Sequence, residues 1–270
     1  MLWAGVLSVA LIAVACASTA PSASTAPSPS TATPSAEIVS DDGRPCFLIR
    51  GTELFRAGQG AVLRPGDLIA TEPGALLMVA FKSGAAVGGI VAVGPSSRLY
   101  WMDRPDRVTL AVRRGWVKVD TLAAGEHLAV HAEGPHLGAA SDAGTFVLHV
   151  GDAVDEVFHE SGSMQLWSRN ADGARTSASS TPNQFARRGG ADPINARFGP
   201  DMDFVDAMPP SFRDPLPLDL AARSRRSAEP ERVREVAYED VADWLSAPRD
   251  WRRGLAKRFG PRLKGPAFSH

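Results

Sequence analysis

Short apolar runs separated by turn-forming residues are the feature that most constrains the fold of this chain. Between Val39 and Trp167 such runs recur at intervals of roughly 8–12 residues, with Gly, Pro, Asp and Ser between them. From Trp116 to Asp120 successive residues alternate between two faces, which places Val117 and Val119 together on one of them. β-Branched residues are frequent, and we find no helical stripe in this region. We therefore predict a mainly β domain over residues 39–168, with strands stacked as a sandwich, barrel or solenoid.

The beginning of the chain predicts export. Leu2 to Ala15 is an uncharged apolar run, shorter than the roughly 20 apolar residues that a membrane-spanning helix needs. It ends at Ala13 to Cys16, where small residues before a cysteine resemble a bacterial lipobox, in which the signal is cut before a cysteine that is then lipidated. We expect residues 1–16 to be a signal peptide and Cys16 to be the lipidated residue. The alternatives are an ordinary signal peptide with an incidental cysteine, and a start codon placed too far downstream.

A tether is predicted next. Every residue from Ala17 to Ala36 is Ala, Ser, Thr or Pro, so the segment has almost nothing to bury and should stay extended and mobile. We assign residues 17–38 to this tether. Ala17 stands where lipoproteins retained at the inner membrane typically carry Asp, so we expect a periplasmic protein attached to the outer membrane through its lipid anchor.

Charge and cysteine content bound the partners of the folded region. The net charge of −1 gives the whole chain no strong attraction to nucleic acid, and we expect no nucleic-acid partner. Residues 1–170 hold 12 basic and 16 acidic side chains, whereas residues 171–270 hold 17 and 14. If Cys16 carries the anchor, only Cys46 remains, so no internal disulfide forms. Its apolar neighbours predict that Cys46 is buried.

A series of motifs in the β-region resembles FecR-like domains. Leu63 to Gly74 is similar to the LxxGDxLxTxxxG opening of that family, and the later motifs follow in the same order. They are the strand Leu77 to Phe81, the turn Lys82 to Gly84, the segment Gly94 to Leu99, the LxxGxVxV match Leu110 to Val119, the GTxFxV match Gly144 to Val150, and the closing strand Glu160 to Leu166. The longer stretch Ala85 to Val93 should form a bulge or an extra short strand. The resemblance implies a stacked β architecture, usually periplasmic, that serves signalling or binding rather than catalysis.

Histidines suggest a metal hypothesis that their spacing does not support. Five of the six histidines lie between His127 and His159. His127 and His131 would share a strand face roughly 13 Å apart, at about 3.3 Å per residue, which is too far for one ion. The chain has no phosphate-binding loop and no Gly-x-Ser-x-Gly nucleophile motif. We therefore predict no metal, no cofactor and no enzymatic activity.

The remainder of the chain divides into two parts. Residues 169–235 are polar and rich in proline, which predicts an extended connection. Scattered aromatic residues between Phe198 and Leu220 indicate that this part packs on another surface, with a disordered linker as the alternative. Residues 236–264 show helical spacing interrupted at Pro248, which predicts a helical hairpin.

The second predicted helix is amphipathic and basic. Trp251, Leu255 and Phe259 recur every four residues on one face, whereas four basic residues crowd the other sides. These candidates for binding an anionic surface are Arg252, Arg253, Lys257 and Arg258. Phospholipid head groups, lipopolysaccharide and polyanionic glycans are ligands of suitable charge. The alternative is a small helical cap that docks on the β-domain, with its arginines simply solvated.

Together these features predict a non-catalytic protein of the cell envelope: a lipid-anchored FecR-like domain that binds a ligand or an envelope protein at the periplasmic face. No cytoplasmic sigma-binding region precedes the apolar segment, so we do not expect direct regulation of a sigma factor. A peptidoglycan- or polysaccharide-binding module is the second class, with Trp101, Trp116 or Trp167 as sugar-stacking candidates if exposed. An unrecognised hydrolase is the third class, and it requires a pocket that joins carboxylates or histidines from distant strands.

Overall fold

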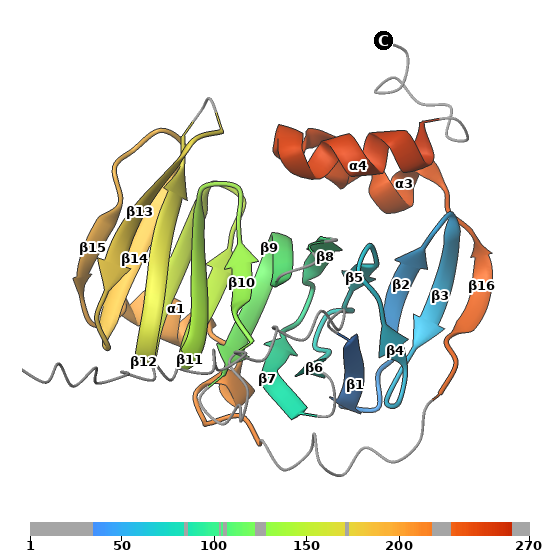
Figure 1. Ribbon diagram of the computed structural model, residues 1–270, viewed down its shortest axis with the longest axis horizontal. Coiled ribbons are helices and arrows are strands. Elements are labelled where there is room, and N and C mark those ends of the chain that lie inside the picture. The colour runs from blue at the N-terminus through green and yellow to red at the C-terminus, as the bar shows by residue number, and fades with distance from the viewer. Residues whose placement is uncertain are drawn as a thin grey trace, which may run out of the picture. The chain divides into compact units, whose positions relative to one another are not determined.

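Two β-layers that belong to one continuous sheet make up the folded part of the chain (Figure 1). The computed structural model describes residues 35–83, 86–102, 104, 107–121, 128–170, 173–217 and 228–260. It is mainly β, with 55% strand and 14% helix, and over these residues the large mixed sheet is not closed into a barrel. The predicted fold class, mainly β with a few helices near the C-terminus, is therefore confirmed.

The first layer carries the C-terminal helices on its outer face. In order across the layer its strands are β16 (Glu231–Glu235), β3 (Glu53–Ala57), β2 (Cys46–Arg50), β5 (Leu68–Ala70), β8 (Arg98–Met102), the first half of β9 (Val108–Asp120), β10 (Val130–Glu133), the start of β11 (Leu137–Val150), the end of β12 (Val154–Arg169) and β13 (Arg175–Ser180). β9 and β10 pair in parallel, whereas their neighbours pair antiparallel.

The second layer continues through the same long strands. It contains β4 (Val62–Leu63), β1 (Ser35–Asp41), β6 (Leu77–Ser83), β7 (Ala86–Val93), the second half of β9, the end of β11, the start of β12, β14 (Gln184–Gly189) and β15 (Asn195–Phe198). β9 changes layer near Gly115, where φ is +94° and an added Cβ would lie 2.6 Å from the Cα atom of Ser97. Glycine is required there because any side chain would clash with backbone.

The apolar core lies between the layers and takes alternate residues from most strands. Val117 and Val119 point into it, as the sequence predicts, and so does Cys46, which is 1% exposed. Phe81 and Trp101 meet edge to face, with 5.1 Å between their ring centroids. Full burial of each large apolar side chain stabilises the fold by about 1.5–3 kcal/mol, so this core is the main source of stability.

A short helical segment covers the outer face of the second layer. It contains α1 (Met202–Ala207) and η1 (Pro210–Phe212), whose buried residues Phe204 and Phe212 pack on Trp116 and its neighbours. Lys118 Nζ, although almost fully buried, donates hydrogen bonds to Phe212 O at 2.8 Å and to Asp214 O at 3.0 Å. The packing expected for the aromatic residues after Phe198 is therefore present.

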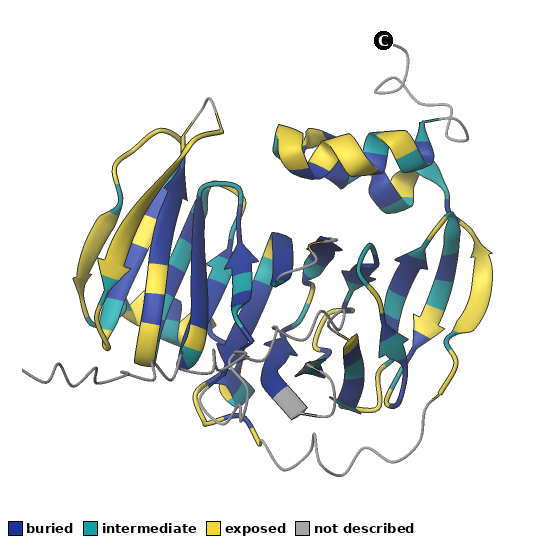
Figure 2. Ribbon diagram, viewed as in Figure 1, coloured by how far each residue is buried: buried dark blue, intermediate teal, exposed yellow. Residues whose placement is uncertain are grey.

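Three helices cover the outer face of the first layer. They are α3 (Tyr238–Val241), η2 (Ala242–Ser246) and α4 (Arg249–Phe259), with Pro248 at the N-terminal cap of α4. The predicted stripe of Trp251, Leu255 and Phe259 is buried against the sheet, and the opposite side of α4 is exposed (Figure 2). Among the described residues, no helix has the length and apolar character needed to cross a membrane.

Three segments differ from the sequence prediction or refine it. Residues 35–38 of the predicted tether already belong to β1, because Ala36 and Ile38 enter the core. The extra stretch after the turn at Lys82 forms a strand, β7. Residues 175–198, predicted as part of an extended connection, instead form β13, β14 and β15. The reason is that β12 offers a long free edge, and backbone pairing with it organises segments that carry little apolar pattern.

Candidate functional site

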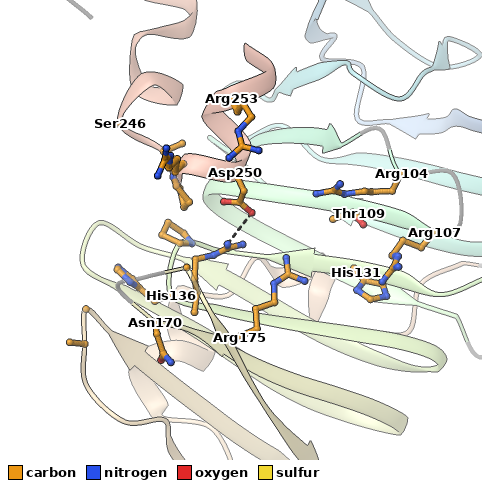
Figure 3. Close-up of a pocket in the computed structure, with 18 residues that line it drawn as sticks. Arg104, Arg107, Thr109, His131, His136, Asn170, Arg175, Ser246, Asp250 and Arg253 are labelled. Atoms are coloured by element: carbon orange, nitrogen blue, oxygen red, sulfur yellow. Dashed lines mark hydrogen bonds and ion pairs between the residues drawn. The ribbon is translucent and has the colours of Figure 1, made fainter. Parts of the chain in front are cut away.

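A groove of about 1300 Å³ lies beside α4, on the outer face of the first layer (Figure 3). Parallel pairing of β9 with β10 places Thr109 beside His131 and Ala111 beside Glu133. Ala111 belongs to the apolar cluster beneath the helices, whereas Thr109 and His131 line the groove. The same sheet face therefore changes from apolar to polar where the helical cover ends.

Among the described residues that line the groove, six are arginines and one, Asp250, is a carboxylate. They come from four separate parts of the chain: the segment before β9, the end of β12, the start of β13, and the first two turns of α4. The six are Arg104, Arg107, Arg169, Arg175, Arg249 and Arg253. In Figure 3, Arg253 and Asp250 from α4 and Arg175 from the sheet point toward the same space. The groove is therefore strongly positive, although the whole chain is nearly neutral.

Glu133, which is 1% exposed, holds two of these arginines and α4 in place. Its Oε1 atom accepts a hydrogen bond of 2.9 Å from Trp251 Nε1 and lies 3.3 Å from Arg169 Nη2. Its Oε2 atom pairs with Arg175 Nη2. One buried carboxylate therefore joins the helical cover to the sheet and orients both arginines at the base of the groove.

Two polar side chains at the groove have hydrogen-bonding capacity that the described residues do not use. Arg169, with 9% of its side chain exposed, donates from Nη1 to Asp250 Oδ2 at 2.9 Å, but its Nε and Nη2 atoms have no hydrogen-bond partner. The hydroxyl of Thr109, a residue 5% exposed, also has none. A buried polar group without a partner costs about 1–3 kcal/mol.

The N-terminal end of α4 adds to the positive potential. Residues 246–250 line the groove, and the helix begins without a side-chain hydrogen bond to its cap. The first intrahelical bonds run from Trp251 N and Arg252 N to Pro248 O. Free N–H groups and the helix dipole both favour an anion at such an end.

A buried carboxyl group positions the turn between β10 and β11, which carries His136 to the groove. Asp155 Oδ2 accepts hydrogen bonds from His136 N at 2.6 Å and from Leu137 N at 2.9 Å. Burial raises the pKa of Asp155 to about 6, and these two backbone hydrogen bonds offset part of that effect. The charge state of Asp155 is therefore coupled to the conformation of the turn at the groove margin.

The four basic residues predicted to bind an anionic surface do not share one surface of α4. Arg252 Nη1 donates to a carbonyl oxygen of η2 at 3.2 Å, and Arg258 Nη1 donates to Gly66 O at 2.7 Å. Lys257 is exposed but does not line the groove, whereas Arg253 does. The structure therefore brings only Arg253 of the predicted set into the groove.

Sequence reasoning missed the other five arginines. Arg104, Arg107, Arg169 and Arg175 stand singly or in pairs far from the basic helix, and no local pattern distinguishes them from solvated surface charges. Arg249 lies in the basic C-terminal stretch, which was the one available signal. Pairing of β9 with β10, and of β12 with β13, is what places these arginines beside α4.

The histidines are distributed over several surfaces. His131 and His136 line the groove, whereas His149 stacks on Trp116 with 4.0 Å between ring centroids. His159 is fully buried, and burial lowers its pKa. In the part of the chain that the structure describes, no group of three or more His, Cys, Asp or Glu side chains is arranged to hold a metal ion.

Other residues singled out from the sequence also have defined positions. Burial raises the pKa of the Cys46 thiol to about 12, which keeps it neutral and unreactive. The proposed sugar-stacking residues Trp101, Trp116 and Trp167 are all buried, at 1%, 8% and 6% exposure. Cys16 and His127 lie outside the described residues.

No model of a known protein family matches the chain, and no curated protein matches it. Two crystal structures, at 1.65 and 2.50 Å resolution, of a proposed anti-sigma factor from Parabacteroides distasonis are similar to it, each with a TM-score of 0.37. Their identities are 11% and 12% over 52% of this chain, and the match spans 63% and 62% of those chains.

Proposed function

We propose that this protein is a non-catalytic binding protein of the cell envelope, and that the groove beside α4 holds an anionic ligand. The observation that carries the proposal is that the described residues lining a groove of about 1300 Å³ include six arginines and one carboxylate. Guanidinium groups pair with phosphate, sulfate and carboxylate groups through charge-assisted hydrogen bonds, which are about twice as strong as neutral ones.

The FecR-like motifs and the export signal support a location at the periplasmic face. The domain is attached to the membrane by lipid at Cys16, and residues 17–34 of the tether give it reach. Its partner is an anionic polymer or an anionic protein surface of the envelope. Because Trp101, Trp116 and Trp167 are buried, recognition of a neutral glycan by stacking on these three residues has no support.

The contacts of α4 support a signalling role. Trp251 joins this helix to Glu133, and Arg258 joins it to Gly66 in the turn of the FecR-like opening motif. A ligand held between α4 and the sheet binds only when the helical cover is docked. Binding therefore stabilises the docked arrangement of α4 by mass action. A partner protein that binds only this docked arrangement would respond to the ligand.

The test compares two charge reversals on the same helix. We expect the double variant Arg249→Glu with Arg253→Glu to bind dextran sulfate roughly tenfold more weakly or worse, because each charge-assisted hydrogen bond contributes about 1.5–3 kcal/mol. Both side chains are exposed, and Glu in the first turn suits the helix dipole, so folding should be retained.

The matched control is Lys257→Glu, on an exposed position of α4 outside the groove. It should weaken binding no more than twofold, as measured by titration calorimetry on the full-length chain at fixed salt. Equal losses for the two variants would assign binding to the general basic surface of the helix rather than to the groove. No binding of dextran sulfate by the unmodified chain would reject the proposed function itself.

A further inference from the structure

We infer that a second site, separate from the groove, binds a small amphiphile that has an aliphatic chain and one anionic head group. The site is a pocket of about 400 Å³ whose walls come from β2, β3 and β5 of the sheet, from β16, and from α3 and η2. That volume falls within the range of about 300–1,000 Å³ that is typical of small-molecule sites. Among the described residues, the pocket and the groove beside α4 share no lining residue.

The sheet side of this pocket is apolar. Phe47 and Ile49 of β2 and Leu54 of β3 line it, and all three belong to the apolar cluster beneath the C-terminal helices. Phe47 is only partly buried, and Val233 of β16, which also lines the pocket, is 45% exposed. An aliphatic chain that displaces water from such surface gains free energy. The pocket therefore favours a ligand with an apolar body.

A bulge in β16 brings an apolar and a charged side chain to the same wall. The register of β16 on β3 shifts between Arg232 and Arg234, so Val233 has no paired residue in β3. Successive residues of a regular strand point to opposite faces, whereas Val233 and Arg234 both line the pocket. This wall therefore suits a ligand that has both an apolar and a charged part.

The carboxylate of the pocket is already occupied by groups of the chain. Among the described residues that line the pocket, three are arginines and one, Asp240, is a carboxylate. Arg234 donates to both oxygens of Asp240, at 2.7 and 2.8 Å, and the N–H of Ala237 donates to Oδ2 at 2.7 Å. A cationic ligand would have to displace Arg234 from Asp240. The pocket therefore disfavours a positively charged head group.

One of the three arginines keeps its charge available. Arg98 Nη1 lies 3.1 Å from Asp243 Oδ1, so that its charge is balanced. Arg56 is exposed and has no ion pair or hydrogen bond among the described residues. Glu231 lies opposite Arg56 in the pairing of β16 with β3, but it does not line the pocket. Because guanidinium groups pair well with anions, a ligand with one negative charge matches the one guanidinium that is left.

The experiment compares three probes with the same eight-carbon chain: octanoate, octanol and octylamine. It uses titration calorimetry on the full-length chain with Cys16→Ala, so that no acyl chain on the protein competes for the pocket. We expect octanoate to bind at least fivefold more tightly than octylamine, with octanol between them. Methyl NMR spectra should show that octanoate shifts the signals of Ile49, Leu54 and Val233.

Arg56→Gln tests the contact with the head group. It should lower the affinity for octanoate about three- to fivefold, as expected for an ion pair that solvent reaches, and leave the affinity for octanol unchanged. The matched control is Arg64→Gln, at an exposed position outside the pocket, which should change neither affinity. Both side chains are exposed, so both variants should keep the melting temperature of the unmodified chain.

Three results would overturn the inference. The first is equal affinity for octanoate and octylamine, and the second is an equal effect of Arg56→Gln and Arg64→Gln. Tight binding of octanol with no preference for octanoate would instead indicate an uncharged occupant, such as an apolar side chain of a partner protein. The third is competition between dextran sulfate and octanoate, which would place octanoate in the groove. Failure of octanoate to bind would reject this pocket as a site and leave the proposed function of the groove in place.

Discussion

At the scale of single residues, Glu133 is the side chain on which the groove depends most. It is buried beneath two arginines and the indole N–H of Trp251, so its charge is balanced and its oxygens are hydrogen-bonded. A buried ion pair adds little net stability, but breaking one leaves an uncompensated charge in a poorly solvated place. The role of Glu133 is therefore to specify how α4 and the arginines are arranged.

Glu133→Gln should lower the free energy of unfolding by about 3 kcal/mol, because it removes one partner of a buried ion pair. The loss should be at the low end of the range for such a change, since Asp250 still faces Arg169. Urea unfolding measures this. The control is Glu53→Gln, which breaks the exposed pair of Glu53 with Arg232 and should cost less than about 1 kcal/mol. Losses of the same size in both variants would show that Glu133 has no special role.

At the scale of elements, the turn between β10 and β11 joins the groove to a titratable group. Asp155 accepts the N–H groups of His136 and Leu137, and it does so from a buried position in β12. Since its folded pKa of about 6 lies above the ordinary value of 3.8, the folded state binds a proton more tightly than the unfolded state. The stabilising contribution is full below about pH 4 and is lost as the pH rises through about 6.

The free energies of unfolding of the unmodified chain and of Asp155→Asn should therefore depend differently on pH. The stability of the unmodified chain relative to the variant should fall by up to about 3 kcal/mol between pH 4 and pH 7, from a pKa difference of about 2 units. Denaturant melts at several pH values give this difference, in which the other titrating groups cancel. Asp152→Asn, at an exposed position in the turn between β11 and β12, is the matched control. A constant difference for Asp155→Asn would contradict the role of Asp155.

At the scale of the whole molecule, helical segments cover both outer faces of a two-layered sheet. Lys118 donates hydrogen bonds to carbonyl groups of the segment after α1, which covers the second layer. Glu133 accepts a hydrogen bond from Trp251 of α4, which covers the first layer. The strands β13, β15 and β16 at the margins of the sheet are exposed (Figure 2). The groove lies where the second cover ends, so the same helix closes the core and borders the candidate site.

Attachment to the membrane is also a property of the whole molecule. If Cys16 is lipidated, cells fed a clickable fatty acid should label the unmodified chain and not Cys16→Ala, and only the former should sediment with the outer membrane. Cys46→Ala is the control, because its buried thiol should not be modified. Equal labelling of Cys16→Ala and the unmodified chain would reject the lipid anchor.

The sequence by itself determined the features that depend on local chemistry. Alternation from Trp116 to Asp120 placed Val117 and Val119 in the core, and four-residue spacing placed Trp251 and its stripe against the sheet. The turn at Asp67 also depends on local chemistry, because its carboxylate accepts the N–H of Arg64 at 2.8 Å. Each of these outcomes is set by neighbours within a few residues along the chain.

Only the tertiary structure decided the strands after β12 and the groove. β13 contains no large apolar residue, and its extended form depends on the free edge of β12. Lys118, on the face opposite to Val117 and Val119, is buried because a segment about 95 residues later packs over it. The six arginines converge because strands distant in sequence pair with one another and α4 docks beside them. Such long-range pairing leaves no periodic signal in the sequence around any one arginine.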